Sequence, residues 1–505
     1  MLDPKYVPLF VGGFIAYIIF MILVGYFSTR GKSEGSNFLT GGSNLGFFLI
    51  FCTVGATMIG TGSSMGAISN GFNHGWGGAI YGLGAAAGIL SMLLFVKIRE
   101  KNFLTMSEEA QYYFGGKMIV RQVMGFMMFV IEIIWLGNHM NGGSKYLAYI
   151  TGLPDVTCKV ITVLAFAIYV YIGGYLAVVI TDAVQFCIIV AGFGFIAIKA
   201  LPTAGGYEAV TQAFTEAGKA GAMGFYGIGS YGLMAAIALV VSTYMGVIGT
   251  PTHRTRIYTS ANKGVAKRAF LSSGIMLFFW SFITAIIGMS AYTIMVHNGD
   301  TLASGDYAFS YMATSVLGPA IGLLFMIAGL SATMSSGDSD AISGVTILLT
   351  DVYPSVTGKT IKEEDYPKYS RIALVVTLSV AFLITLFVND VITYIQTVVG
   401  ALLPGVAVCM FMGRFWKRAT WQGALACIAS GTLFGIAILV IPPFTAWVNA
   451  TMGGPAVPAS VISLVFGVVV SLATPADNTP EEERVQAVYN GRRGKVAEIA
   501  AKAEQ

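Results

Sequence analysis

The stretch Ser331–Asp340, SATMSSGDSD, decides how this chain is interpreted. It follows directly on Val316–Leu330, and the two segments together are long enough to cross a bilayer. At 100° per residue, four of its residues share one helix face of about 100°: Ala332, Ser335, Ser336 and Ser339. Lipid does not stabilise such an oxygen-lined face. The stretch therefore predicts a membrane helix whose polar face meets protein, water or an ion.

The composition indicates a polytopic membrane protein. Of 505 residues, 55% are hydrophobic and only 11% are charged, and the mean hydropathy is +0.74. These values lie far outside the range of soluble globular chains, and no region has the composition of a separate soluble domain. The five cysteines are scattered, so we interpret them as packing residues rather than as a disulfide framework or a metal site.

The apolar runs predict an all-α protein with about thirteen transmembrane helices. The expected spans are 7–27, 44–71, 75–97, 122–149, 155–174, 177–200, 229–250, 270–296, 315–348, 372–389, 391–413, 420–441 and 457–474. We expect one transmembrane domain over residues 1–474 and a charged tail over 475–505, which can form a short surface helix. The first span is not a cleavable signal, because its basic residues Arg30 and Lys32 follow it.

The basic residues predict the orientation of the chain. If the N-terminus lies outside, 24 of the 29 Lys and Arg residues fall on the inner side. This asymmetry fits the positive-inside rule, and an odd number of spans places the C-terminus in the cytoplasm. We therefore expect a multi-pass protein of the plasma or inner membrane.

Four carboxylates lie within the expected spans: Glu132, Asp182, Asp338 and Asp340. Each acid at a helix centre costs about 2.5–3.5 kcal/mol on insertion scales. We therefore expect these groups to face protein, water or an ion. A solvated position at the end of its span is an alternative for Asp340.

Two motifs carry a resemblance to a known family. The segment Gly173–Gln185, GGYLAVVITDAVQ, is similar to the signature of the sodium/solute symporter family. The matching positions are Gly173, Gly174, Ala177, Val178, Thr181, Asp182 and Gln185. A second motif resembles the family's pattern in its ninth helix: Ser335, Ser336, Asp338 and Ser339. The expected spans extend the resemblance over most of the chain.

The resemblance implies the LeuT-type fold, in which two five-helix inverted repeats surround a site at the bilayer midplane. The repeats would cover about 44–200 and 229–413, with the second span broken. The residues themselves support a break, because glycines weaken the middle of this span: Gly55, Gly60, Gly62 and Gly66. Without the resemblance, these glycines fit a small-residue packing face equally well.

The resemblance also implies that Na⁺ is the coupling ion. Backbone carbonyls of Ala56, Ile59 and Ala332, with the hydroxyls of Ser335 and Ser336, would hold it, since Na⁺ prefers oxygen ligands. Some relatives have a second ion position. Here it would be built from Asp182, Ser335, Asp338 and Ser339, although this chain has Asp338 where the best-matching relatives have a hydroxyl. Ordinary bonding of the serines to helix carbonyls is the alternative.

The solute site is expected beside the break. Candidate lining residues come from three spans: Ser63, Met65, Gly66, Glu132, Trp135, Asn138, His139, Tyr244 and Met245. Glu132 and Trp135 share a helix face, so they could receive an amine or a quaternary ammonium group. We therefore expect a Na⁺-coupled symporter that carries a small organic solute into the cell by alternating access.

A zwitterion, amino acid or monocarboxylate is favoured as the solute. A sugar or vitamin symporter, or a passive channel or sensor on the same fold, is the alternative. An enzyme is not expected, because the four histidines are spread among different spans and loops. The expected partners are the solute and membrane lipid, without nucleic acid. A monomer would suffice for transport, and the oligomeric state is left open.

Overall fold

The computed structural model describes residues 2–29, 44–362, 365–387 and 390–493, and its regular elements in these ranges are helices. One isolated parallel bridge joins Leu45 to Ser260. The first half of the chain forms α1 (Val7–Thr29), α3 (Phe47–Met58), α4 (Ala67–His74), α5 (Ala79–Ser91), α6 (Met106–Tyr113), α7 (Met118–Thr151), α8 (Asp155–Thr203), α9 (Gly206–Glu216), α10 (Ile228–Tyr231) and α11 (Leu233–Gly249).

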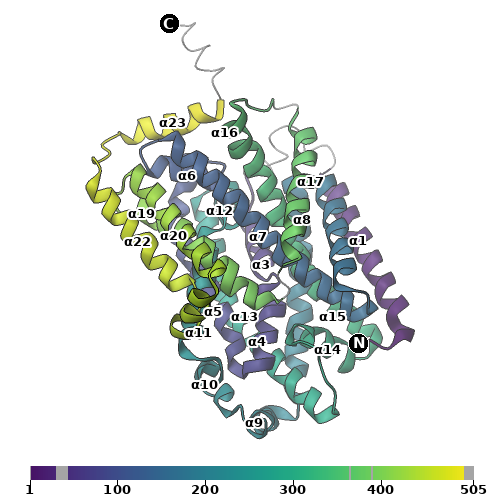
Figure 1. Ribbon diagram of the computed structural model, residues 1–505. Helices are drawn as coiled ribbons and strands as arrows, with labels where there is room; N and C mark the ends of the chain where they lie inside the picture. Colours follow the sequence, from purple (N-terminus) through teal and green to yellow (C-terminus); the bar gives the residue numbers. More distant parts are fainter. Residues whose placement is uncertain (1, 30–43, 363–364, 388–389, 494–505) are drawn as a thin grey trace.

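The second half of the chain completes the bundle (Figure 1). Its helices are α12 (Pro251–Thr259), α13 (Lys263–Asn298), α14 (Ala308–Ser315), α15 (Pro319–Ile347), α16 (Tyr353–Thr357), α17 (Tyr366–Thr385), α18 (Val391–Tyr394), α19 (Gly400–Phe415), α20 (Trp421–Val440), α21 (Pro442–Met452), α22 (Ala456–Ala473) and α23 (Glu481–Arg493). Exposed apolar side chains such as Ile198, Leu433 and Phe466 lie on the outer helices, as expected of a surface that faces lipid.

The described residues contain ten helices that are long and apolar enough to cross a membrane, or eleven if one bent pair counts as a span. The all-α class is confirmed, but the count of thirteen is not. Two expected spans account for the difference. The span 44–71 is interrupted after Met58, and the span 155–174 is the first part of α8.

The first interruption lies between α3 and α4. At Ile59 the backbone leaves helical geometry (φ −85°, ψ 51°), and a π-helical turn, Gly62–Gly66, follows. The interior of the protein leaves no room for side chains here, because a Cβ on Gly60 would lie 2.4 Å from Ser336 Oγ. The predicted break in the second span is thus present, and its glycines admit close neighbours.

A second interruption, which the sequence analysis did not predict, separates α11 from α12. Thr250 is extended (φ −90°, ψ 122°), and Pro251 starts α12 as its first residue. Proline suits this position because its φ is preset and its missing N–H would have no partner in the first turn. Both interrupted helices border the candidate site.

The central helix of the bundle is α15, which carries the stretch Ser331–Asp340. It packs against α7, α8 and α3, and every residue of the stretch is buried. α8 turns at Gly174, whose positive φ of 61° is a conformation that glycine adopts without strain. This turn directs the part of α8 that contains Asp182 toward α3 and α15.

The C-terminal helix α23 lies at the end of the bundle opposite the N-terminus and contacts α6 (Figure 1). Arg492 donates to both carboxylate oxygens of Glu108, at 2.7 and 2.5 Å, and Tyr489 Oη donates to Lys101 O at 2.8 Å. The expected surface helix in the tail is therefore docked on the protein. Residues 494–505 of the tail lie outside the described ranges.

Candidate functional site

Oxygen atoms of α15 and α3 meet where α3 ends. Ser335 Oγ donates to Ala56 O at 3.1 Å, and Ser336 Oγ donates to Thr57 O at 2.8 Å. Both hydroxyls also lie within 3.4 Å of Ala332 O, on their own helix. All of these residues are buried. The structure thus brings together four of the five residues predicted to hold Na⁺, and it adds the carbonyl of Thr57.

The fifth predicted residue, Ile59, lies at the point where α3 ends. Its N–H donates to Gly55 O, whereas its own ψ of 51° turns the chain out of the helix. Carbonyls at a helix end do not all have helical partners, so they are free to serve as ligands. The donors present are carbonyl and hydroxyl oxygens without a formal charge, which suits a small monovalent hard cation.

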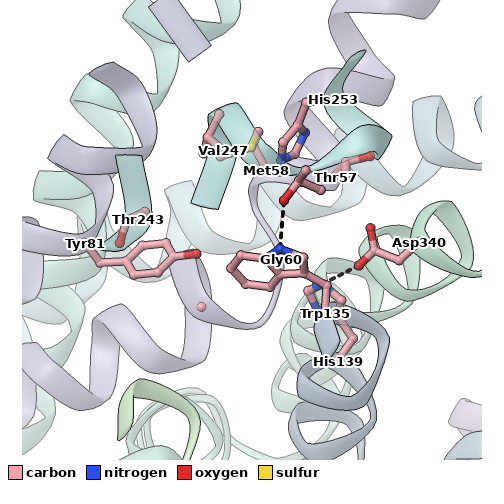
Figure 2. Close-up of a pocket in the computed structure, with 12 residues that line it drawn as sticks. Thr57, Met58, Gly60, Tyr81, Trp135, His139, Thr243, Val247, His253 and Asp340 are labelled. Atoms are coloured by element: carbon pink, nitrogen blue, oxygen red, sulfur yellow. Dashed lines mark hydrogen bonds and ion pairs between the residues drawn. The ribbon is translucent and has the colours of Figure 1, made fainter. Parts of the chain in front are cut away.

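A small pocket lies beside this break (Figure 2). Side chains from α3, α5, α7, α11, α12 and α15 line it, among them Trp135 and His139, two of the predicted solute ligands. Its cavity of about 30 Å³ has room for roughly two water molecules. A larger solute can enter only if the surrounding helices move.

His139 joins three elements at the pocket. The Thr61 N–H donates to His139 Nδ1 at 3.5 Å, and Thr61 Oγ1 lies 2.9 Å from the same atom. A backbone N–H only donates, so in the neutral imidazole the proton is on Nε2. His139 Nε2 faces Asp340 Oδ2 at 3.2 Å (Figure 2). The ring thus connects the break in the second span to α15.

Asp340, which the sequence analysis also allowed to be solvated at the end of its span, lines the pocket and is 3% exposed. It is the only Asp, Glu, Lys or Arg among the pocket's lining residues in the described part of the chain. Helical periodicity alone could have placed it beside Ser336, because the two residues are four positions apart. No sequence signal specified that both would face the break.

Glu132 lies next to the pocket rather than in its lining. Its carboxylate accepts the Thr252 N–H at 2.9 Å, the Thr252 hydroxyl at 2.7 Å and the Ser343 hydroxyl at 2.8 Å. It also interacts with Asp340. Trp135, on the same face of α7, donates through Nε1 to Thr250 Oγ1 at 2.8 Å. Glu132 therefore connects α7 to α12 and α15.

The other predicted solute ligands are not part of this pocket lining. Ser63 donates to Met58 O across the break, and a Cβ on Gly66 would meet Ile392 on α18 at 2.9 Å. Tyr244 Oη lies 3.0 Å from Ser91 Oγ, away from the pocket. Three further residues, Met65, Asn138 and Met245, are buried or partly buried without lining it.

The residues predicted to form a second ion position are only partly together. Ser339 Oγ donates to Asp182 Oδ2 at 3.2 Å. Ser335 belongs to the first group of oxygens, and Asp338 Oδ1 accepts the N–H of Ser339 at 2.9 Å. Arg256 of α12, which follows the expected span 229–250, is 1% exposed and contacts both Asp182 and Ser339.

Comparisons with known proteins identify the family of the chain. Residues 38–431 match the model of the sodium:solute symporter family. The sodium/pantothenate symporter of Haemophilus influenzae is 24% identical over 434 residues, with 83% of this chain and 87% of that protein covered. The high-affinity proline transporter PutP of Bacillus subtilis is 25% identical, with 90% and 96% covered.

Among solved structures, a Na⁺-coupled sialic acid symporter in its substrate-bound outward-open state has a TM-score of 0.76. The match covers 93% of this chain and 99% of that chain at 16% identity, and it therefore shows the fold.

The fold and the interrupted helices are those of a multi-pass membrane protein of the LeuT type. The chain belongs to the sodium:solute symporter family. Its function is Na⁺-coupled symport of a small solute, and it is a transporter rather than an enzyme.

Proposed function

We propose that the chain couples inward movement of Na⁺ to uptake of a small solute that carries a positively charged nitrogen, such as an amino acid or another zwitterion. The sodium ion would be held by the carbonyls of Ala56, Ile59 and Ala332 and the hydroxyls of Ser335 and Ser336. The observation that supports this assignment is the meeting of oxygen atoms from α3 and α15 at the break.

The charge of the pocket supports the choice of solute. Asp340 is its only carboxylate, and no Lys or Arg lines it among the described residues. Trp135 and Tyr81 add aromatic surfaces, which attract cations. A monocarboxylate without an amine would meet the carboxylate of Asp340 here and no Lys or Arg among the described lining residues. An amine-bearing solute is therefore favoured over a monocarboxylate or a sugar.

The residues of the site explain how the two ligands are linked. Ion ligands on α3 and α15 stabilise one arrangement of these helices, and His139 joins the break to Asp340 at the pocket. When both ligands bind the same arrangement of the helices better, binding of one raises the affinity of the protein for the other. The cavity of about 30 Å³ is too small for such a solute, so the helices around it must move apart to hold one. The inward gradient of Na⁺ and the membrane potential supply the work, and the potential contributes about 2.3 kcal/mol per charge per 100 mV.

We also propose the placement of the chain in the cell membrane, with the N-terminus outside, the tail in the cytoplasm and the two repeats at about 44–200 and 229–413. The excess of Lys and Arg on one side supports the orientation. The two interrupted helices support the repeats, because each would begin one of them.

Transport in proteoliposomes tests the proposal. The purified protein is reconstituted and given an inward Na⁺ gradient with amino acids, betaines, small carboxylates or sugars. We expect an amine-bearing solute to accumulate above its external concentration only with Na⁺. Equal uptake driven by a proton gradient without Na⁺ would contradict the coupling.

The variant D340N tests the choice of solute. We expect it to lose at least tenfold in solute affinity while Na⁺ still raises its melting temperature. Accumulation of a sugar or a simple carboxylate, with no effect of D340N, would contradict the proposed solute class.

A further inference from the structure

The guanidinium group of Arg256 occupies the space between α3, α8 and α15. Its Nη2 donates to Ser339 Oγ at 2.6 Å and to Thr57 Oγ1 at 3.1 Å, and it lies 3.5 Å from Asp182 Oδ2. Both Nη2 and Nε donate to Thr53 Oγ1, at 3.0 and 3.2 Å. A permanent positive charge is therefore already present where a second ion position was expected.

The hydrogen bonds of Ser339 leave no oxygen lone pair for a metal ion. Its hydroxyl donates to Asp182 at 3.2 Å and accepts hydrogen bonds from Arg256 at 2.6 Å and from Thr57 Oγ1 at 3.2 Å. A hydroxyl has one hydrogen and two lone pairs. All three are engaged, so Ser339 cannot serve as a sodium ligand in this arrangement.

Thr53 is engaged in the same way. Its hydroxyl donates to Asp182 Oδ2 at 2.5 Å and accepts from two nitrogens of Arg256. Asp182 therefore receives hydrogen bonds from two hydroxyls that are themselves bound to the guanidinium, besides the direct ion pair. The guanidinium, 3.5 Å from Asp182 Oδ2, balances the negative charge of Asp182 within the protein, although Asp182 Oδ1 is buried and has no hydrogen-bond partner among the described residues.

We infer that Arg256 is a tethered cation that takes the place of a second Na⁺, so that the chain binds one Na⁺ per transport cycle. A guanidinium suits this role because it stays charged at any physiological pH and can reach several acceptors at once. The one ion that binds from solution is held at the end of α3 by Ser335 and Ser336, one turn of α15 away from Ser339.

The location of Arg256 gives this inference a mechanical consequence. Arg256 lies on α12, which begins at the Thr250 interruption beside the pocket. A free second ion would bind and leave with each cycle. A charge fixed to α12 instead ties this helix to α3, α8 and α15 and moves only when α12 moves. The inference concerns the ion count of the proposed symport and rests on its first sodium site.

The number of bound ions can be measured without any solute. Equilibrium binding of radioactive ²²Na⁺ to the purified full-length protein gives the count per chain. We expect one Na⁺ for the wild type and for R256K, which keeps the charge. R256Q removes the charge and frees the oxygens around Asp182, so its count should rise to two. The double variant R256Q/D182N should return to one, and S336A should bind the ion of the wild type at least tenfold more weakly.

The outcomes separate the inference from the proposed symport. Two Na⁺ ions per wild-type chain would overturn the tethered cation and leave the symport intact. A count of one in folded R256Q would also overturn it, whereas no bound Na⁺ in the wild type would overturn both. Folding of each variant is checked by size-exclusion elution and by its melting temperature. If R256Q does not fold, a wild-type count of two Na⁺ ions still overturns the inference. A wild-type count of one, for an ion that S336A binds more weakly, supports it.

Discussion

Ser336 is the residue on which the sodium site depends most directly. Its hydroxyl reaches Thr57 O on another helix at 2.8 Å, and a Cβ on Gly60 would lie 2.4 Å from it. S336A removes one ligand oxygen from the assembled group. We expect Na⁺ to bind at least tenfold more weakly, which corresponds to about 1.4 kcal/mol. Na⁺-dependent rises in melting temperature measure this loss.

A matched control lies one turn earlier on the same helix. Ser331 is equally buried, but its hydroxyl bonds to Tyr17 Oη at 2.7 Å and to Ile327 O at 2.8 Å, away from the break. S331A should therefore leave Na⁺ affinity unchanged, although it costs about 1 kcal/mol of stability. Equal loss of Na⁺ binding in both variants would show that the effect of S336A is only structural.

At the scale of single residues, periodicity predicted which side chains share a face but not what they meet. Ala332, Ser335 and Ser336 follow from helical spacing together with the family resemblance. The positions of Asp340 and Arg256 in the site could not be predicted from helical spacing, because their partners come from α7, α8 and α3. Arg256 stands in a run of charged and polar residues whose composition resembles that of a cytoplasmic loop, yet ion pairs and hydroxyls compensate its burial.

At the scale of elements, the two interruptions differ in how far the sequence predicted them. The break after Met58 has a local cause, a cluster of glycines in an apolar span, and it was expected. The break at Thr250 depends on a single proline, which fits the end of a span as well as an interruption within one. Only the packing of α12 inside the bundle distinguishes the two.

Gly60 allows a test of the first interruption. A Cβ at this position would lie 2.4 Å from Ser336 Oγ and 2.8 Å from His139 Cε1. G60A should therefore separate α3 from α15, weaken Na⁺ binding and lower stability by about 1–3 kcal/mol, as overpacking does. Melting temperatures with and without Na⁺ measure both effects. G46A, at the start of α3 with no atom within 4 Å of its Cβ, is the control and should keep Na⁺ binding.

The docking of α23 on α6 predicts a pH dependence outside the membrane. Burial alone would raise the pKa of Glu108, but the guanidinium groups of Arg121 and Arg492 hold it below its usual value of 4.5. A carboxylate whose pKa falls on folding contributes stability that is present above its unfolded pKa and lost as the pH falls below it. The stabilisation by Glu108 should thus be full at neutral pH and decline below about pH 4.5.

E108Q tests this dependence. We expect a lower melting temperature than that of the wild type at pH 7, by the equivalent of about 1–3 kcal/mol, and a difference that shrinks as the pH falls below 4.5. E481Q is the matched control, because Glu481 on α23 makes a more exposed ion pair, with Lys101. Exposed pairs contribute little, so E481Q should melt like the wild type. A difference for E108Q that is constant from pH 7 to pH 4 would contradict the assignment.

At the scale of the whole molecule, the composition and the spans determined the class, and the arrangement of helices around α15 required the structure. The helices that border the pocket are far apart in sequence, from α3 to α15, and side-chain contacts rather than local propensity bring them together. The small volume of the cavity, about 30 Å³, also indicates that transport requires a rearrangement of the bundle, which no local pattern in the sequence describes.

The orientation of the whole chain gives the last prediction. Lys5 lies exposed near the N-terminus, and Glu482 lies exposed on α23 at the opposite end of the bundle (Figure 1). The excess of basic residues predicts that α23 lies in the cytoplasm. In a chain with its five cysteines replaced, K5C should react with a membrane-impermeant maleimide in intact cells. E482C should react only after the membrane is permeabilised. The reverse pattern would contradict the proposed orientation, and labelling of both variants in permeabilised cells controls for their reactivity.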